Sequence, residues 1–112
     1  VTILYDLRWN ERFRSRQHDQ RRQILRIANA LSDKNRLKIL QLIAADDYKY
    51  NGKRVAAYTS LSTSVVSRHI KQLREAGLIE EHSPDNRNVL YRLNYDTVAS
   101  FSDEIMVYIK EL

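Results

Sequence analysis

One stretch of the chain carries hydroxyl and basic side chains at spacings that would place them on a single face of a helix. Its members are Thr63, Ser64, Ser67, Arg68 and Lys71. Short hydroxyl side chains can hydrogen-bond to bases or phosphates, and an arginine can bind a guanine through two hydrogen bonds. These residues therefore predict a DNA-contacting surface. The alternative is that the hydroxyls only cap and turn the chain, while Arg68 is a solvated surface residue.

Two other basic segments would flank this surface. Lys53 and Arg54 open a short predicted helix, where the helix N-terminus and the two positive charges favour phosphate. Arg87 and Asn88 lie in a small polar loop that suits contact with phosphate or the minor groove. A plain solvated loop is the competing interpretation of this second segment. With these four residues the predicted DNA-binding set is complete.

Two residues beside the predicted surface have competing interpretations. His69 borders an apolar stripe, where a histidine is more often a packing residue bonded to a neighbouring carbonyl than a ligand. Arg36 either contacts DNA or pairs with Asp33 on its own helix. We assign His69 mainly to structure and leave the role of Arg36 open.

The elements that must position these residues follow from the apolar spacing. The helix face opposite the hydroxyl and basic residues consists of Val66, Ile70 and Leu73. Ser62 is a good N-cap for this helix, and Gly77 ends it as a residue in the left-handed region would. The period then becomes strand-like, so residues 78–82 and 89–93 predict a β-hairpin. Further helices are predicted over residues 17–31, 34–45, 53–59 and 95–112.

This order of elements predicts a winged helix-turn-helix, a mainly α fold with a small β-hairpin. A chain of 112 residues suits one compact domain. We expect residues 1–16 to be an N-terminal extension or leader, or a helix that enters the domain, and residues 17–112 to be the DNA-binding domain with a C-terminal dimerisation helix. No apolar run is long enough for a membrane span, and the lack of cysteine permits a cytoplasmic location.

Three segments also carry recognisable sequence patterns. Residues 30–40 read ALSDKNRLKIL, residues 61–79 read LSTSVVSRHIKQLREAGLI, and residues 91–93 read YRL. They resemble the entry segment, the recognition segment and the wing-closing Y-x-L of the ArsR/SmtB family of bacterial winged-helix repressors. The resemblance spans residues 24–94 and implies a DNA-binding regulator whose last helix takes the place of the dimerisation helix.

The chain departs from the metal sensors of that family. Their Cys-x-Cys would fall at about residues 51–53, and this chain has no cysteine at all. His18, His69 and His82 lie on three different predicted elements, so they offer no set of three or four ligands. We therefore expect no metal site and no cofactor.

Charge and apolar patterns together predict a homodimer. Residues 8–26 carry a net charge of +5 and residues 95–112 a net charge of −3. The Arg-rich helix could flank DNA, or it could pack on the acidic last helix of the same or a partner chain, which we prefer. The apolar stripes of these helices exceed what one small domain can cover. The predicted dimer interface comprises Ile24, Ile27, Leu31, Phe101, Ile105, Ile109 and Leu112.

The predicted function is a sequence-specific, dimeric transcriptional repressor that binds a palindromic operator. The alternative is a winged-helix module that docks a protein and has no specific DNA target. No catalytic triad order or phosphate-binding glycine loop occurs, so we expect no enzyme. The expected partners are double-stranded DNA, a second copy and an unidentified small-molecule or protein effector, but no membrane. The aromatic residues that could line an effector pocket are more often core, namely Trp9, Phe13, Tyr48, Tyr50 and Tyr58.

Overall fold

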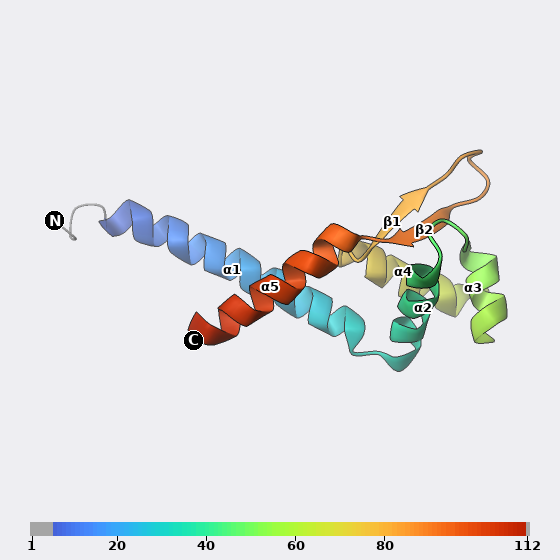
Figure 1. Cartoon of the computed structure of the whole chain (residues 1–112), viewed down its shortest axis with the longest axis horizontal. Helices are drawn as coiled ribbons and strands as arrows, with labels where there is room; N and C mark the ends of the chain where they lie inside the picture. Colours follow the sequence, from blue (N-terminus) through green and yellow to red (C-terminus); the bar gives the residue numbers. More distant parts are fainter. Residues whose placement is uncertain (1–5, 112) are drawn as a thin grey trace.

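The computed structural model describes the backbone of residues 6–111 and the side chains of residues 19–110. Within this range the chain forms helices and one hairpin in the predicted order (Figure 1). The elements are α1 (Asp6–Leu31), α2 (Lys34–Ala45), α3 (Gly52–Thr59), α4 (Thr63–Glu75), β1 (Ile79–His82), β2 (Leu90–Leu93) and α5 (Tyr95–Glu111). The predicted fold class, a mainly α winged helix-turn-helix with a small hairpin, is confirmed.

Three of the helices that precede the hairpin, α2, α3 and α4, begin at side-chain caps. Asp33 accepts a hydrogen bond from the backbone N–H of Arg36 at 2.9 Å, and Ser62 accepts one from Val65 at 3.2 Å. Asn51 does the same for Arg54 at 2.9 Å. Each cap satisfies a donor in the first helical turn that has no partner within the helix. Polar residues therefore set the start of α2, α3 and α4.

The core lies where α2, α3 and α4 meet the hairpin. Ile39 and Ile43 of α2, Val55 of α3 and Leu73 of α4 all have an exposed fraction of 0%. Leu78, which joins α4 to β1, is 1% exposed and belongs to the same cluster. Burial of these side chains holds the helix-turn-helix together and fixes which face of α4 points outward.

The loop between α2 and α3, for which the sequence predicts no regular structure, packs along the edge of the hairpin. β1 and β2 pair antiparallel, with Ile79 opposite Leu93. Tyr50 bridges to Tyr91 on the free edge of β2, and the backbone N–H of Tyr48 donates to the Tyr91 carbonyl at 2.9 Å. Both tyrosines thereby tie the loop before α3 to the wing. Tyr50 is 5% exposed and part of the core.

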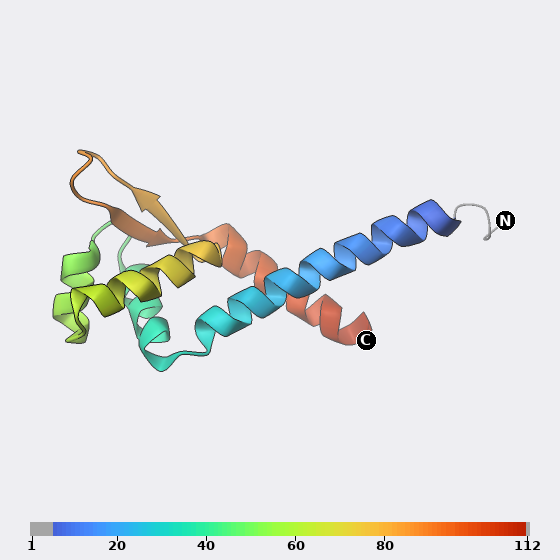
Figure 2. The same ribbon diagram turned by 180° about the vertical axis from the view of Figure 1, so that it is seen from behind.

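Helices α1 and α5 cross beside this body, and the N-terminal half of α1 extends beyond it (Figures 1 and 2). α1 begins at Asp6 rather than at residue 17, so one continuous helix spans the predicted boundary at residues 16 and 17. Residues 6–16 contain neither Gly nor Pro, and the Arg, Leu and Glu among them are good helix formers. The expected division into residues 1–16 and 17–112 remains a prediction.

The packing of α1 corrects part of the predicted dimer interface. Ile24 is 6% exposed and Ile27 is 1% exposed, so both are buried within the protomer. Leu31 and Phe101 pack half-buried against the core. The sequence predicts that these apolar side chains meet a partner, but the chain covers most of them with its own α5 and core. Leu112 lies outside the described residues.

Candidate nucleic-acid interface

The two faces of α4 are sorted as the sequence predicts. Val66, Ile70 and Leu73 are buried, with exposed fractions of 1%, 4% and 0%. The opposite face is exposed and consists of Thr63, Ser64, Ser67, Arg68 and Lys71. Because the buried face is locked into the core, the outward side chains are held on a rigid helix. Such a helix is suited to enter the major groove of DNA.

A groove of about 540 Å³ lies between α4, the start of α3 and the wing. From the predicted set it is lined by Lys53, Thr63, Ser67, Arg68, Lys71, Arg87 and Asn88. Residues from three separate segments of the sequence therefore share one surface. Ser64 and Arg54 do not line it. The guanidinium of Arg54 instead donates to the Lys49 carbonyl at 3.0 Å and supports the loop before α3.

The groove is positively charged. Lys53, Arg68, Lys71 and Arg87 form no ion pair with the described carboxylates. Arg74 also lines the groove, but it pairs with Glu81 of β1 at 2.5 Å, and this hydrogen bond raises the pKa of Arg74. Arg74 thus holds the wing strand against α4, and the other four cations are available to a polyanion.

The wing tip is folded by one carboxylate. Asp85 accepts hydrogen bonds from the backbone N–H groups of Asn88 at 3.0 Å and Arg87 at 3.1 Å. These two hydrogen bonds lower the pKa of Asp85, and the bond from Asn88 has the larger effect. Asn86 adopts a left-handed conformation with φ of 61°, which asparagine tolerates better than most residues. The tip is therefore an ordered turn that projects Arg87 and Asn88.

The structure assigns Arg36 a role that the sequence leaves open. Arg36 is 7% exposed, and its guanidinium donates to the carbonyls of Ala30 at 2.6 Å and Asn29 at 2.9 Å. It neither reaches the groove nor pairs with Asp33 through its side chain, since only its backbone N–H bonds Asp33. His69 is structural as predicted, but its Nδ1 lies 3.4 Å from Nη1 of Arg36 rather than bonding a carbonyl.

Among the aromatic residues of the predicted effector set, the three with described side chains pack against different neighbours. Tyr50 is buried and meets the exposed Tyr58 edge to face, whereas Tyr48 packs against His82 of the wing. Trp9 and Phe13 have side chains outside the described range. The described residues also contain no group of three or more His, Asp or Glu side chains placed to bind a metal. Over the same part of the chain, every helix is too short or too polar to cross a bilayer.

A helix-turn-helix with one exposed face, followed by a two-stranded wing, defines the winged-helix class of DNA-binding proteins. The sequence model of the bacterial regulatory proteins of the arsR family matches residues 33–81, which contain the whole helix-turn-helix and most of β1. Over this segment the chain is similar to the arsR family, and the match together with the fold supports a DNA-binding transcriptional regulator; the chain has no cysteine.

Solved structures support the same fold. The ArsR-like transcriptional regulator from Rhodococcus sp. RHA1 has a TM-score of 0.71 and 21% identity, over 80% of this chain and 81% of that chain. The homodimeric winged helix-turn-helix DNA-binding domain from Mycobacterium bovis has a TM-score of 0.67 and 24% identity, over 87% and 88%. NolR from Sinorhizobium fredii has a TM-score of 0.65 and 21% identity, over 80% and 87%. Curated protein sequences give no match.

Proposed function

We propose that this regulator is a homodimeric repressor that binds a palindromic operator through the groove described above. One observation carries the proposal: α3, α4 and the wing bring seven of the predicted DNA-binding residues onto one basic surface. In this arrangement α4 lies in the major groove, with Arg68 reading a base. Lys53, Lys71 and Arg87 contact phosphates on either side.

The dimer supplies the second recognition helix. The Mycobacterium bovis domain of the same fold is homodimeric. Here Val98, Met106 and Ile109 of α5 are 37%, 57% and 62% exposed, and Leu25 of α1 is 57% exposed. A second copy that covers these side chains would place two α4 helices about one DNA turn apart. This symmetry is the reason to expect a palindromic site.

The test is fluorescence anisotropy with DNA from upstream of the encoding gene and with a scrambled fragment of equal length. Arg68→Ala should weaken binding to the native fragment by about 1–3 kcal/mol and reduce discrimination between the two. Arg68→Lys keeps the charge but loses the two-pronged hydrogen bond, so it should bind both fragments alike. Lys110→Ala on α5, outside the groove, should leave binding unchanged.

Two outcomes would separate repression from protein docking. A preference for the native fragment that depends on Arg68 supports the repressor. Equal, weak binding to both fragments that disappears at moderate salt would mean that the groove only attracts polyanions. That result would favour the alternative function, a winged-helix module whose basic face docks an acidic protein.

A further inference from the structure

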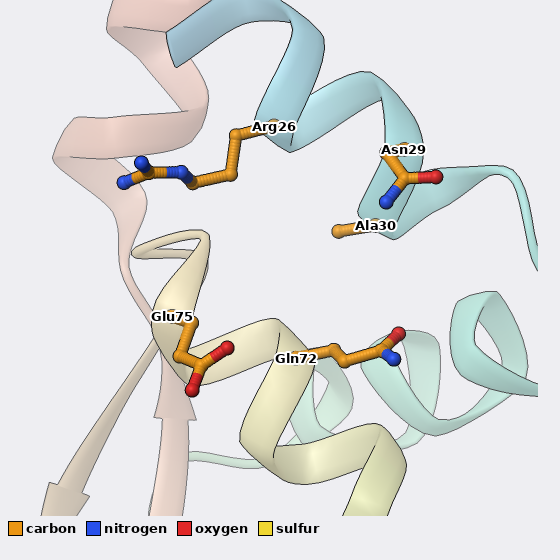
Figure 3. A pocket seen from close by; sticks show the side chains of 5 residues that line it. All are labelled: Arg26, Asn29, Ala30, Gln72 and Glu75. Carbon is orange, nitrogen blue, oxygen red and sulfur yellow. The ribbon is translucent and has the colours of Figure 1, made fainter. Parts of the chain in front are cut away.

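A second cavity lies on another side of α4, where its C-terminal half faces α1. Its volume is about 510 Å³, within the range of roughly 300–1,000 Å³ that is usual for small-molecule sites. The lining residues are Arg26, Asn29, Ala30, Gln72 and Glu75 (Figure 3). None of them belongs to the DNA-binding set, so this cavity is separate from the nucleic-acid interface.

The cavity has one cationic, one anionic and two amide side chains around a small apolar wall. In the view of Figure 3, Arg26 and Glu75 stand on facing helices at one end, and Asn29 and Gln72 stand at the other. Ala30, 4% exposed, lies on the α1 side. Arg26 and Glu75 form no ion pair with each other or with another described side chain. Opposite charges therefore face one space without neutralising each other.

The position of Glu75 at the end of α4 favours a bound cation next to its carboxylate. Glu75 is the last residue of α4, where the partial negative charge of the helix C-terminus adds to that of the carboxylate. An ammonium group would be stabilised by both. Arg26 offers a planar donor pair that matches a carboxylate. A small ligand that carries both an ammonium group and a carboxylate would pair with Glu75 and Arg26 at the same time.

The cavity wall is also connected to the recognition helix. Asn29 and Ala30 provide the two carbonyls that bind the Arg36 guanidinium, and the same guanidinium lies 3.4 Å from His69 of α4. His69 and Gln72 are three residues apart and so lie on one side of α4. A molecule between α1 and α4 would change the spacing of two helices that Arg36 links. The orientation of the helix that carries Arg68 would change with it.

We propose that this cavity binds a free α-amino acid, with the ligand carboxylate on Arg26 and its ammonium group on Glu75. The amides of Asn29 and Gln72 contact the remainder of the ligand. Its binding shifts the position of α4 and so changes the affinity for DNA, a consequence that rests on the proposed function. Binding itself does not require DNA.

The first experiment uses the whole chain without DNA. Individual L-amino acids are titrated at up to millimolar concentration and followed by ¹H–¹⁵N NMR, including the side-chain amides of Asn29 and Gln72. One or more amino acids should shift these resonances, and Arg26→Gln or Glu75→Gln should each weaken binding by about tenfold or more. Arg22→Gln and Asp103→Asn, exposed charges outside the cavity, are the matched controls. Ethylamine and propionate carry one charge each and should bind far more weakly than the amino acid.

Three results would overturn the proposal. The first is no shift with any amino acid, and the second is a shift that survives both cavity variants. The third is a set of cavity resonances that respond only to protein concentration, since a second copy would then fill the space. If an amino acid binds, DNA affinity is measured with and without it, and linkage requires the same factor in both directions. If the protein binds an amino acid in this cavity but does not bind DNA, the proposed function is wrong and the proposed amino-acid site still stands.

Discussion

Arg36 is a charged side chain inside the protein, and its environment explains why it is tolerated there. Its guanidinium donates to the Ala30 and Asn29 carbonyls in the last turn of α1, and the Asn29 carbonyl also accepts hydrogen bonds from the backbone N–H and the hydroxyl of Ser32. The partial negative charge of the helix C-terminus favours a cation at this position. Arg36 thus joins the first turn of α2 to the end of α1.

Replacement of Arg36 tests this role. Arg36→Met keeps the length of the side chain but leaves two carbonyls without their charged donor. We expect the free energy of unfolding to fall by about 2–3 kcal/mol, measured by urea denaturation. Arg22→Met, on the exposed side of α1, should change it by less than about 0.5 kcal/mol. Equal effects of the two variants would show that Arg36 does not hold the helices together.

Asp33 makes stability depend on pH. The hydrogen bond from the backbone N–H of Arg36 lowers the pKa of Asp33 from its ordinary value of 3.8. A lowered folded-state pKa means that the ionised carboxylate stabilises the fold above that value, and this contribution is lost as the pH falls through the folded pKa. Asn is an equally good cap that does not titrate in this range.

Wild type and Asp33→Asn should therefore differ in stability by a constant amount near neutral pH. As the pH falls below about 4, the wild type should lose stability relative to Asp33→Asn, because its carboxylate then becomes protonated. The measurement is urea unfolding, followed by circular dichroism, at a series of pH values. Asp103→Asn removes an exposed carboxylate that caps no helix among the described elements, and serves as the control. A gap that stays constant down to the acid limit would contradict the assignment.

At the scale of elements, the turn between α3 and α4 contains a strained position. Ser60 has φ of 59°, a left-handed conformation that costs an L-residue roughly 1–2 kcal/mol and glycine very little. Ser60→Gly should raise the free energy of unfolding by about 0.5–1 kcal/mol after the added freedom of the unfolded chain is subtracted. The matched change Ser100→Gly, inside the exposed part of α5, should lower it by a similar amount. Two effects of the same sign would argue against the strain.

The elements that could be predicted from the sequence are those with a local signal. Ser62 and Gly77 mark the ends of α4, and the structure gives Gly77 the expected left-handed conformation with φ of 76°. The bridge from Tyr50 to Tyr91 could not be predicted, because it pairs residues far apart in the sequence whose spacing carries no period. The pattern leaves open whether residues 1–16 are a leader or a helix, because their few apolar residues form no regular helical stripe.

The salt dependence of DNA affinity can test whether the positive charge of the wing contacts DNA. Arg87 projects from a tip that Asp85 orders, so we expect it to contact one phosphate. Arg87→Ala should weaken binding to native and scrambled DNA alike and reduce the slope of log affinity against log salt by about 1. Lys110→Ala is the control and should leave the slope unchanged. A loss confined to the native fragment would instead indicate base contact by the wing.

At the scale of the whole molecule, the candidate site was more predictable than the dimer surface. The exposed face of a helix is defined by its own sequence, so the outward position of Arg68 and Lys71 could be predicted from spacing alone. Whether an apolar helix face meets the chain's own core or another chain depends on tertiary packing, which the spacing of Ile24 and Ile27 does not reveal. In the structure, the exposed apolar side chains of α5 include Val98, Met106 and Ile109, whereas the predicted Phe101 is half-buried.

This exposed stripe gives the prediction for the assembly. Val98 and Ile109 lie on one side of the helix, next to the half-buried Ile105, and Met106 lies at the outer edge of the same side. Contiguous exposed apolar side chains on a helix indicate an interface. We expect Ile109→Lys to place an unpaired charge in that interface and to shift the protein from dimer to monomer.

Sedimentation equilibrium over a range of protein concentrations measures this change. Ser100→Lys adds the same charge on the other side of α5, next to Gln23 of α1, and should leave the dimer intact. Since Ile109 is 62% exposed in the protomer, the substitution should alter the stability of the isolated fold by no more than about 0.5 kcal/mol. A monomer that keeps its fold should bind half of a palindrome and lose the added affinity of the second half-site. If Ile109→Lys stays dimeric, the two copies meet elsewhere, and the apolar stripe of α5 must be covered by a different partner.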